Sequence, residues 1–337
     1  MPQGQLAQVL RGLDDRKDVR MLVGPQSFDD AGVFVLGPSE GVPLGAPGSP
    51  RVALVQTLDF FPPVVDHPYW YGAIAAANSV SDVYAMGGRP LTALTLASLP
   101  KGFPAEWTAE IFRGGFDKIA EAGAVVVGGH TVESEIQFGF SVTGVVDPAR
   151  MTANSGARAG DLVYLTKPVG MGSMTTSSKK RVIDWATMEP AVAQMATLNA
   201  KAAEAMIAAG SKAATDVTGF GLVGHGRNVA KGSGVTLRIE LARVPIFPGA
   251  LELASAGHCS GGAKRGRTGL ASEVRIAPGV SEGMLNIVFD AETSGGLLIA
   301  IAPDRAAVLE SELRARGVLV ACIGSFVPAS GVHVELV

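Results

Sequence analysis

Residues 71–88 read YGAIAAANSVSDVYAMGG, and this run of small and apolar residues predicts a helix over residues 71–86. Pro68 stands near its start, where a missing backbone N–H costs little, and Gly87-Gly88 end it. Asn78 and Asp82 are four residues apart, so they project from one face of the helix. An unpaired buried carboxylate is costly. Asp82 is therefore expected either to bind Mg²⁺, or to hydrogen-bond to the backbone or cap a neighbouring helix.

Strand patterns flank this helix on both sides. Each is rich in β-branched and apolar residues and ends at a polar residue or a glycine turn. A second helix is expected over residues 105–122, between two of the strands. The expected strands of this half cover residues 51–59, 124–127 and 138–146.

A domain boundary is predicted near residue 150. Residues 147–161, DPARMTANSGARAGD, are rich in turn formers, and a new apolar strand, LVYLT, follows them. The second half shows an alanine-rich helix over residues 188–209 and strands over 235–239, 295–301 and 318–323. We therefore predict an α/β protein with domains at residues 1–150 and 151–337.

Composition excludes several classes of protein. The chain has 337 residues, 47% of them hydrophobic, and a net charge of −3 without a long Lys/Arg cluster, which argues against a nucleic-acid partner. The N-terminus resembles no signal peptide, and no apolar run is long enough to span a membrane. Cys259 and Cys322 are far apart and lack zinc-site spacing. A cytoplasmic protein is expected, with an amphipathic first helix around residues 6–13.

Further aspartates lie in apolar or glycine-rich sequence. Asp29-Asp30 precede the apolar run AGVFVL, where a carboxylate pair indicates either a bound cation or a turn. Asp59 ends a strand. Asp216 lies in ATDVTGFGLVGH, whose glycines let backbone approach a ligand closely, although a helix N-cap is the competing interpretation.

Two glycine turns follow or precede strands. Gly128-Gly129-His130-Thr131 is typical of a phosphate-binding turn, but such pairs are common. Thr293-Ser294-Gly295-Gly296 is expected to be a structural turn before a buried strand, and His225 a hydrogen-bonded structural residue. Because no GxxxxGK[ST] sequence occurs, the dispersed aspartates indicate a nucleotide held through metal ions.

Seven motifs occur in an order that closely resembles the selenophosphate synthetase family. They are SFDD (27–30), TLDFF (57–61), AAANSVSDVYAMGG (75–88), GGHT (128–131), LTKPVG (165–170), TDVTGFGLVGH (215–225) and ETSGGLL (292–298). The resemblance extends from about residue 20 to the C-terminus. It implies a fold like that of aminoimidazole-ribonucleotide synthetase, in which the sheet of the N-terminal α/β domain pairs across a homodimer and the C-terminal domain is an α/β sandwich.

The resemblance also implies ligands. In this family, ATP, selenide and water give selenophosphate, AMP and phosphate. Asp30, Asp82 and Asp216 look like Mg²⁺ ligands. Ser27, Phe28, Asp29, Asp59 and Asn78 look like ATP contacts, and Gly129, His130 and Thr131 look like ATP contacts donated by the dimer partner.

One expected segment does not match. Family members carry, just before the first helix, a glycine-rich segment with Cys or selenocysteine and a Lys. Neither Cys259 nor Cys322 fits that motif, so these catalytic residues are expected upstream of Met1. The chain would then be a shortened one, or one whose start was placed after an in-frame UGA codon. The alternatives are a Mg·ATP-binding regulatory paralogue without catalysis, and another ATP-using enzyme of the same superfamily.

Overall fold

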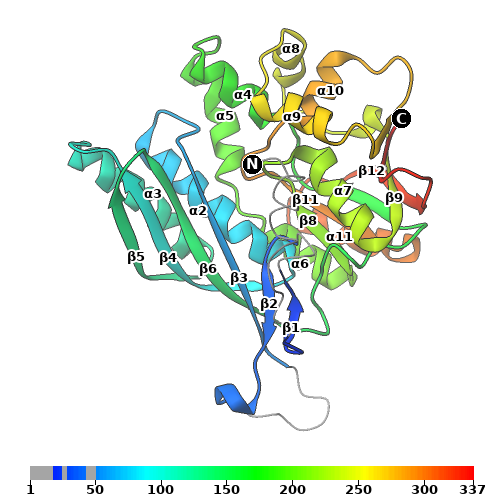
Figure 1. Ribbon diagram of the computed structural model, residues 1–337, viewed down its shortest axis with the longest axis horizontal. Coiled ribbons are helices and arrows are strands. Elements are labelled where there is room, and N and C mark those ends of the chain that lie inside the picture. Colours follow the sequence, from blue (N-terminus) through cyan, green and yellow to red (C-terminus); the bar gives the residue numbers. More distant parts are fainter. Residues whose placement is uncertain (1–17, 25–28, 43–50) are drawn as a thin grey trace.

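The structure is a computed structural model that describes residues 18–24, 29–42 and 51–337. The expected first helix at residues 6–13, the ATP contacts Ser27 and Phe28, and the catalytic residues expected upstream of Met1 lie outside the described residues. The remaining chain forms two halves, each built on its own sheet (Figure 1).

The first half contains a sheet whose described strands run in the order β1-β2-β3-β6-β4-β5. Neighbours pair antiparallel, except that β4 and the edge strand β5 run parallel. The strands are β1 (Met21–Val23), β2 (Gly32–Val35), β3 (Ala53–Phe61), β4 (Arg89–Leu99), β5 (Val125–Glu133) and β6 (Gln137–Val146).

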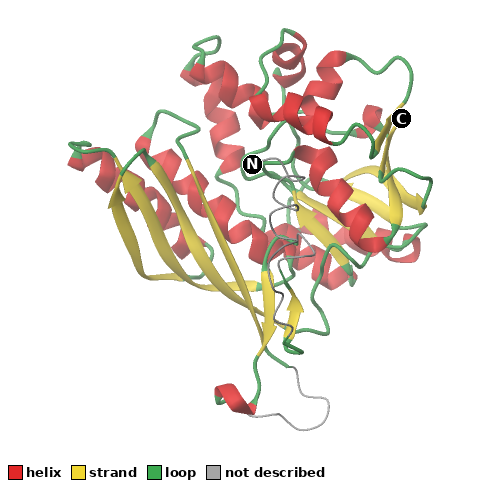
Figure 2. Cartoon of the chain, viewed as in Figure 1, coloured by secondary structure: helices red, strands yellow, loops and turns green. Residues whose placement is uncertain are grey.

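Two helices, α2 (Pro68–Ala85) and α3 (Ala105–Glu121), cover one face of this sheet, and its other face is bare (Figure 2). Glycines allow the two helices to touch. A Cβ at Gly72 would lie 1.8 Å from the carbonyl oxygen of Ile111, and one at Gly114 would lie 1.9 Å from that of Tyr69. Only residues without a side chain permit this separation.

Helix α2 is buried from Tyr71 to Ala85 because it lies between the first sheet and the second half. It contacts β3 and β6 on one side and β8, α5 and α6 on the other. A helix buried all round must be small and apolar all round, which explains its alanine-rich sequence. The polar side chains Asn78 and Asp82 therefore lie at the junction of the two halves.

The second half contains a sheet with the strand order β10-β13-β9-β12-β7-β11-β8, flanked by helices. Its strands are β7 (Leu162–Leu165), β8 (Ala213–Asp216), β9 (Val235–Ile239), β10 (Val274–Ile276), β11 (Leu297–Ile301), β12 (Ala321–Pro328) and β13 (Val334–Leu336). Its helices are α4 (Met171–Lys179), α5 (Trp185–Met195), α6 (Ala200–Ala209), α7 (Gly221–Ser233), α8 (Ala250–Ser255), α9 (Gly261–Gly269), α10 (Glu282–Phe289) and α11 (Ala306–Ala315). The two sheets with their flanking helices confirm the α/β class that the sequence predicts.

One expected element is wrong. The single helix over residues 188–209 is two helices, α5 and α6, with a break between Met195 and Ala200. In the break, the carbonyl of Thr197 accepts a hydrogen bond from the Lys167 ammonium, and the side chain of Asn199 donates to Gly295. These tertiary contacts replace helical hydrogen bonds that alanine propensity alone would favour.

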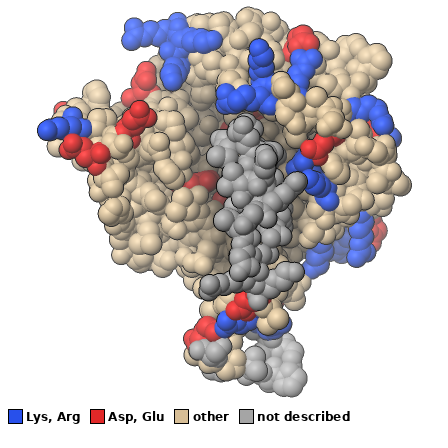
Figure 3. All heavy atoms as spheres, viewed as in Figure 1, with Lys and Arg blue, Asp and Glu red and all other residues tan. Residues whose placement is uncertain are grey.

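Within the described residues, no helix is long and apolar enough to cross a membrane. Lys and Arg side chains occur in several separate groups on the face shown in Figure 3.

Candidate functional site

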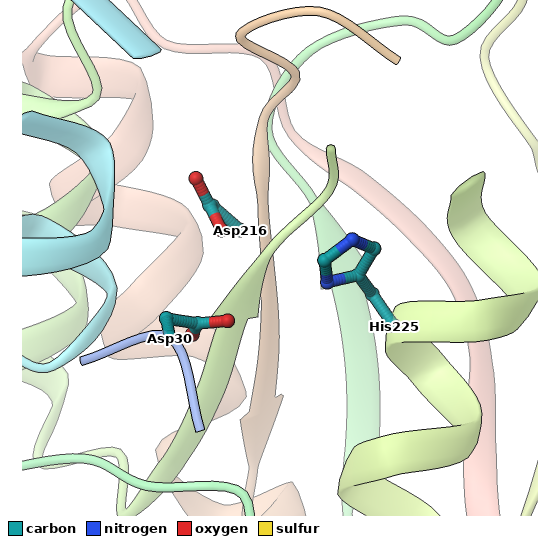
Figure 4. A group of neighbouring side chains, drawn as sticks. All are labelled: Asp30, Asp216 and His225. Atoms are coloured by element: carbon teal, nitrogen blue, oxygen red, sulfur yellow. The ribbon is translucent and has the colours of Figure 1, made fainter. Parts of the chain in front are cut away.

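Aspartates from both halves meet at the junction. Asp30 lies just before β2, Asp82 near the end of α2 and Asp216 at the end of β8. Figure 4 shows Asp30, Asp216 and His225 gathered from three separate elements. One carboxylate oxygen each from Asp30 and Asp216 and one ring nitrogen of His225 lie within 4.8 Å of one another. The structure thus brings together two of the three aspartates that the sequence singles out as candidate metal ligands, while Asp82 lies near enough for the charges of Asp216 and Asp30 to raise its pKa.

Their charges repel one another in a buried setting. Burial raises the pKa of Asp30 well above its usual value, and the charge of Asp216 raises it further. Burial also raises the pKa of Asp82, and the charges of Asp59, Asp216 and Asp30 add to the effect. The pKa of Asp216 is raised to about 7, mainly by burial. A positively charged group at this junction would reduce the repulsion between these carboxylates.

The donor set fits a divalent cation such as Mg²⁺. Asp30 Oδ1 accepts a hydrogen bond of 2.8 Å from the Thr215 hydroxyl. Oδ2 of Asp30 and Oδ2 of Asp216, by contrast, are enclosed and have no hydrogen-bond partner among the described residues. Enclosed carboxylate oxygens without donors are costly, and hard cations prefer oxygen ligands of this kind.

A second pair of polar groups joins α2 to β3. Asn78 Nδ2 donates to Asp59 Oδ2 at 2.6 Å, and the Thr57 hydroxyl donates to Asp82 Oδ2. Burial raises the pKa of Asp59 to about 6, although the Asn78 amide lowers it. Thr57 was not among the sequence candidates. Its position two residues before Asp59, on the same face of the strand, is the signal that would have revealed it.

Hydrogen bonds hold the ring of His225 in place, as the sequence predicts for a structural histidine. Its Nδ1 lies 3.4 Å from the Thr215 hydroxyl and its Nε2 lies 3.1 Å from the Thr218 hydroxyl. Burial lowers the pKa of His225 to about 4, so the ring is neutral near pH 7. A neutral ring adds no positive charge to offset the aspartates.

The glycine turn expected at residues 128–131 is wrong, because these residues lie within strand β5. Gly129, His130 and Thr131 are therefore on an exposed edge strand, not among the aspartates. Gly129 pairs with Thr95, Thr95 with Phe140 and Phe140 with Asp59. Gly129 and Asp59 therefore share one row of the sheet but are three strand spacings apart, roughly 14 Å. Within one chain, these two sets of candidate residues do not meet.

Asp29 also reaches the second half. Its Oδ1 accepts a hydrogen bond of 2.6 Å from the backbone N–H of Asn154. The start of the first sheet is thereby tied to the segment that links the two halves.

Two α/β halves with an acidic junction define a class, the AIR synthase related proteins. The chain matches the model of their N-terminal domain over residues 28–146 and that of their C-terminal domain over residues 158–337. Within this class, the chain belongs to the selenide, water dikinase family. It is 44% identical to the selenide, water dikinase of Geobacter metallireducens, across 92% of this chain and 88% of the relative. It is 39% identical to that of Clostridioides difficile, across 96% and 90%.

Solved structures share the fold at lower identity. Thiamine monophosphate kinase from Aquifex aeolicus superposes with a TM-score of 0.64 at 18% identity, covering 99% of this chain and 96% of the other. The hydrogenase maturation protein HypE in complex with ATP gives 0.61 at 19% identity, covering 85% and 78%. At such identities, the likeness concerns the fold alone.

Proposed function

We propose that this chain catalyses the reaction for which its relatives are named, the ATP-dependent conversion of selenide and water to selenophosphate, AMP and phosphate. Membership of the selenide, water dikinase family supports the reaction class. The observation that carries the proposal to this chain is the set of enclosed, mutually repelling carboxylates of Asp30, Asp82 and Asp216. Such a set suits a polyphosphate substrate that arrives with cations.

Asp30, Asp82 and Asp216 would hold Mg²⁺. When bound, Mg²⁺ neutralises charge on phosphate oxygens and so favours phosphoryl transfer. The folded protein would hold these carboxylates close together although their charges repel one another. The hydroxyls of Thr57 and Thr215 fix one oxygen of Asp82 and of Asp30, which leaves their other oxygens available.

The nucleotide would be oriented by Asp59, Asn78, Asp29, Ser27 and Phe28. Asp59 keeps Oδ1 available while Oδ2 accepts from Asn78. Because the junction is largely buried, groups that bind there are shielded from water, which strengthens polar interactions.

The active assembly would be a homodimer that joins the bare faces of two first-half sheets. The bare face carries Leu58, Phe60, Leu94, Val125 and Val132, each 45–59% exposed. His130 pairs with Leu96, Leu96 with Gly139 and Gly139 with Phe60, so His130 shares this face. A second copy packed here would bury the apolar residues and could supply Gly129, His130 and Thr131 to the site of its partner.

A cytoplasmic location belongs to the same proposal. Cys259 and Cys322 are both unpaired thiols, as expected in a reducing compartment.

The test is to incubate this chain, and the same chain extended upstream of Met1, with ATP, Mg²⁺ and selenide without oxygen and to follow phosphorus NMR signals. Selenophosphate and AMP should appear with the extended chain, only when selenide is present, and Asp216→Asn in that chain should abolish both. Asp304→Asn, at an exposed position in another part of the second half, is the matched control. ADP without selenophosphate would favour another kinase of the superfamily. Nucleotide binding without any turnover would favour a regulatory protein.

A further inference from the structure

A chain of hydrogen bonds runs from the second half into the nucleotide site. Lys167 Nζ donates to the carbonyl of Ser294 at 2.8 Å. The backbone N–H of Ser294 donates to Asn78 Oδ1 at 2.9 Å, and Asn78 Nδ2 donates to Asp59 Oδ2 at 2.6 Å. Lys167 and Ser294 belong to the second half, and Asn78 and Asp59 belong to the first.

Ser294 takes part through its backbone. Its φ of 51° lies in the left-handed region that residues other than glycine seldom adopt. Its hydroxyl is enclosed and has no hydrogen-bond partner among the described residues. The neighbouring carbonyl of Gly295 accepts from Asn199 at 2.8 Å, which holds the same turn from another side. A strained backbone whose N–H and C=O both have defined partners is typical of a functional constraint.

Lys167 is itself buried, with 6% of its surface exposed. Its Nζ donates hydrogen bonds to two backbone carbonyls, that of Ser294 at 2.8 Å and that of Thr197 at 2.7 Å. Neither of these acceptors is a carboxylate. Burial of a lysine that donates to two backbone carbonyls costs folding free energy. A contribution to stability therefore does not by itself explain the presence of Lys167.

The geometry decides which way the Asn78 amide points. Because Oδ1 accepts from Ser294, Nδ2 must face Asp59 and can donate to it. If the Ser294 N–H moved away, the amide could rotate and place Oδ1 against the Asp59 carboxylate, where the two acceptors would repel.

We propose that Lys167 and the backbone of Ser294 are positioning residues of the nucleotide site, which act on Asp59 through the amide of Asn78. This role rests on the proposed function of Asp59 and Asn78 as nucleotide contacts. It assigns a purpose to residues of two sequence motifs, LTKPVG and ETSGGLL.

The first experiment measures MgATP binding by calorimetry to the full chain and to Lys167→Met. Loss of a buried hydrogen bond to the turn should weaken binding by about tenfold. Lys231→Met, at an exposed lysine of α7, should bind as wild type does. Wild-type affinity in folded Lys167→Met would overturn the inference. No binding by the wild-type chain would instead overturn the proposed function.

A double-mutant cycle separates positioning from a general structural role. If Lys167 acts through Asn78, then Lys167→Met should weaken binding far less in an Asn78→Ala background than in the wild type. Equal losses in both backgrounds would show that Lys167 acts independently of Asn78 and would reject the proposed path.

Ser294 provides a test that does not depend on the folding of the lysine variant. Ser294→Gly keeps the N–H and accepts a positive φ, whereas the β-branched side chain of Ser294→Val disfavours it. Ser294→Gly should bind MgATP about tenfold more tightly than Ser294→Val. Equal affinities for the two variants would contradict a role for the left-handed backbone.

Discussion

Thr215 and Asp30, 185 positions apart in the chain, are joined by a 2.8 Å hydrogen bond from the threonine hydroxyl to Asp30 Oδ1. The bond fixes the first carboxylate of the site beside the end of β8, where Asp216 follows Thr215 directly. The acidic junction is thereby assembled from residues of the first and second halves.

Asp216→Asn should stabilise the chain when no metal is present. The pKa of Asp216 is raised to about 7 by burial and by neighbouring negative charge, so removing its charge at pH 8 removes a repulsive interaction. The expected gain is at least about 1 kcal/mol, the equivalent of roughly one pKa unit. Chemical denaturation in EDTA would measure it. A variant less stable than wild type in EDTA would show that the carboxylate serves a structural role.

Removal of the metal should destabilise the wild type. With Mg²⁺ and ATP at about 100 times their dissociation constant, the native state should gain about 2.7 kcal/mol. Thermal unfolding should therefore shift upward with MgATP and return on addition of EDTA. Asp216→Asn should show little of this shift. A full shift in that variant would exclude Asp216 as a ligand.

Phe60→Lys should prevent the proposed dimer. Phe60 is 48% exposed on the bare sheet face, and a buried unpaired ammonium there would be costly. Light scattering coupled to gel filtration should report a monomer, with weaker MgATP binding because the partner strand is lost. Trp107→Lys is the matched control, since Trp107 is similarly exposed but lies on α3, the helix layer. A Phe60→Lys dimer would require another interface.

Lys167 should make stability depend on pH. Burial lowers its pKa to about 7, although the charge of Asp216 raises it and that of Lys118 lowers it further. Between about pH 7 and 10.5, the unfolded chain binds a proton that the folded chain does not, so this contribution to stability rises with pH. The free energy of unfolding of the wild type, relative to that of Lys167→Met, should therefore increase as the pH rises through this window. Denaturant titrations at about pH 6.5, 8 and 9.5 would measure this change. A constant difference would contradict a lowered pKa for the buried Lys167.

Gly72→Ala should destabilise the first half. The new Cβ would lie 1.8 Å from the Ile111 carbonyl oxygen, so α2 and α3 would have to separate at a cost of about 1–3 kcal/mol. Gly269→Ala, where nothing lies within 4 Å of the added Cβ, is the control. Urea unfolding compares the two. Equal stabilities would mean that the helices adapt without cost.

The sequence by itself determined the local elements and the family. Local sequence patterns predicted α2, α3 and strands such as β3, β6, β7 and β9 to within a few residues, because these patterns depend on neighbours along the chain, but they missed β4 altogether. The motifs around Asp30, Asp82 and Asp216 were recognisable because glycines and acidic residues in apolar surroundings stand out locally.

Tertiary structure alone decided how these parts meet. The break between α5 and α6 depends on Lys167 and Asn199, whose partners lie elsewhere in the chain. The alignment of Gly129 with Asp59 across three strand spacings, and the link from Lys167 through Ser294 to Asn78, likewise join residues remote in sequence. Such contacts are set by the packing of two halves against α2, and neither a period nor a motif in one segment specifies which other segment it will contact.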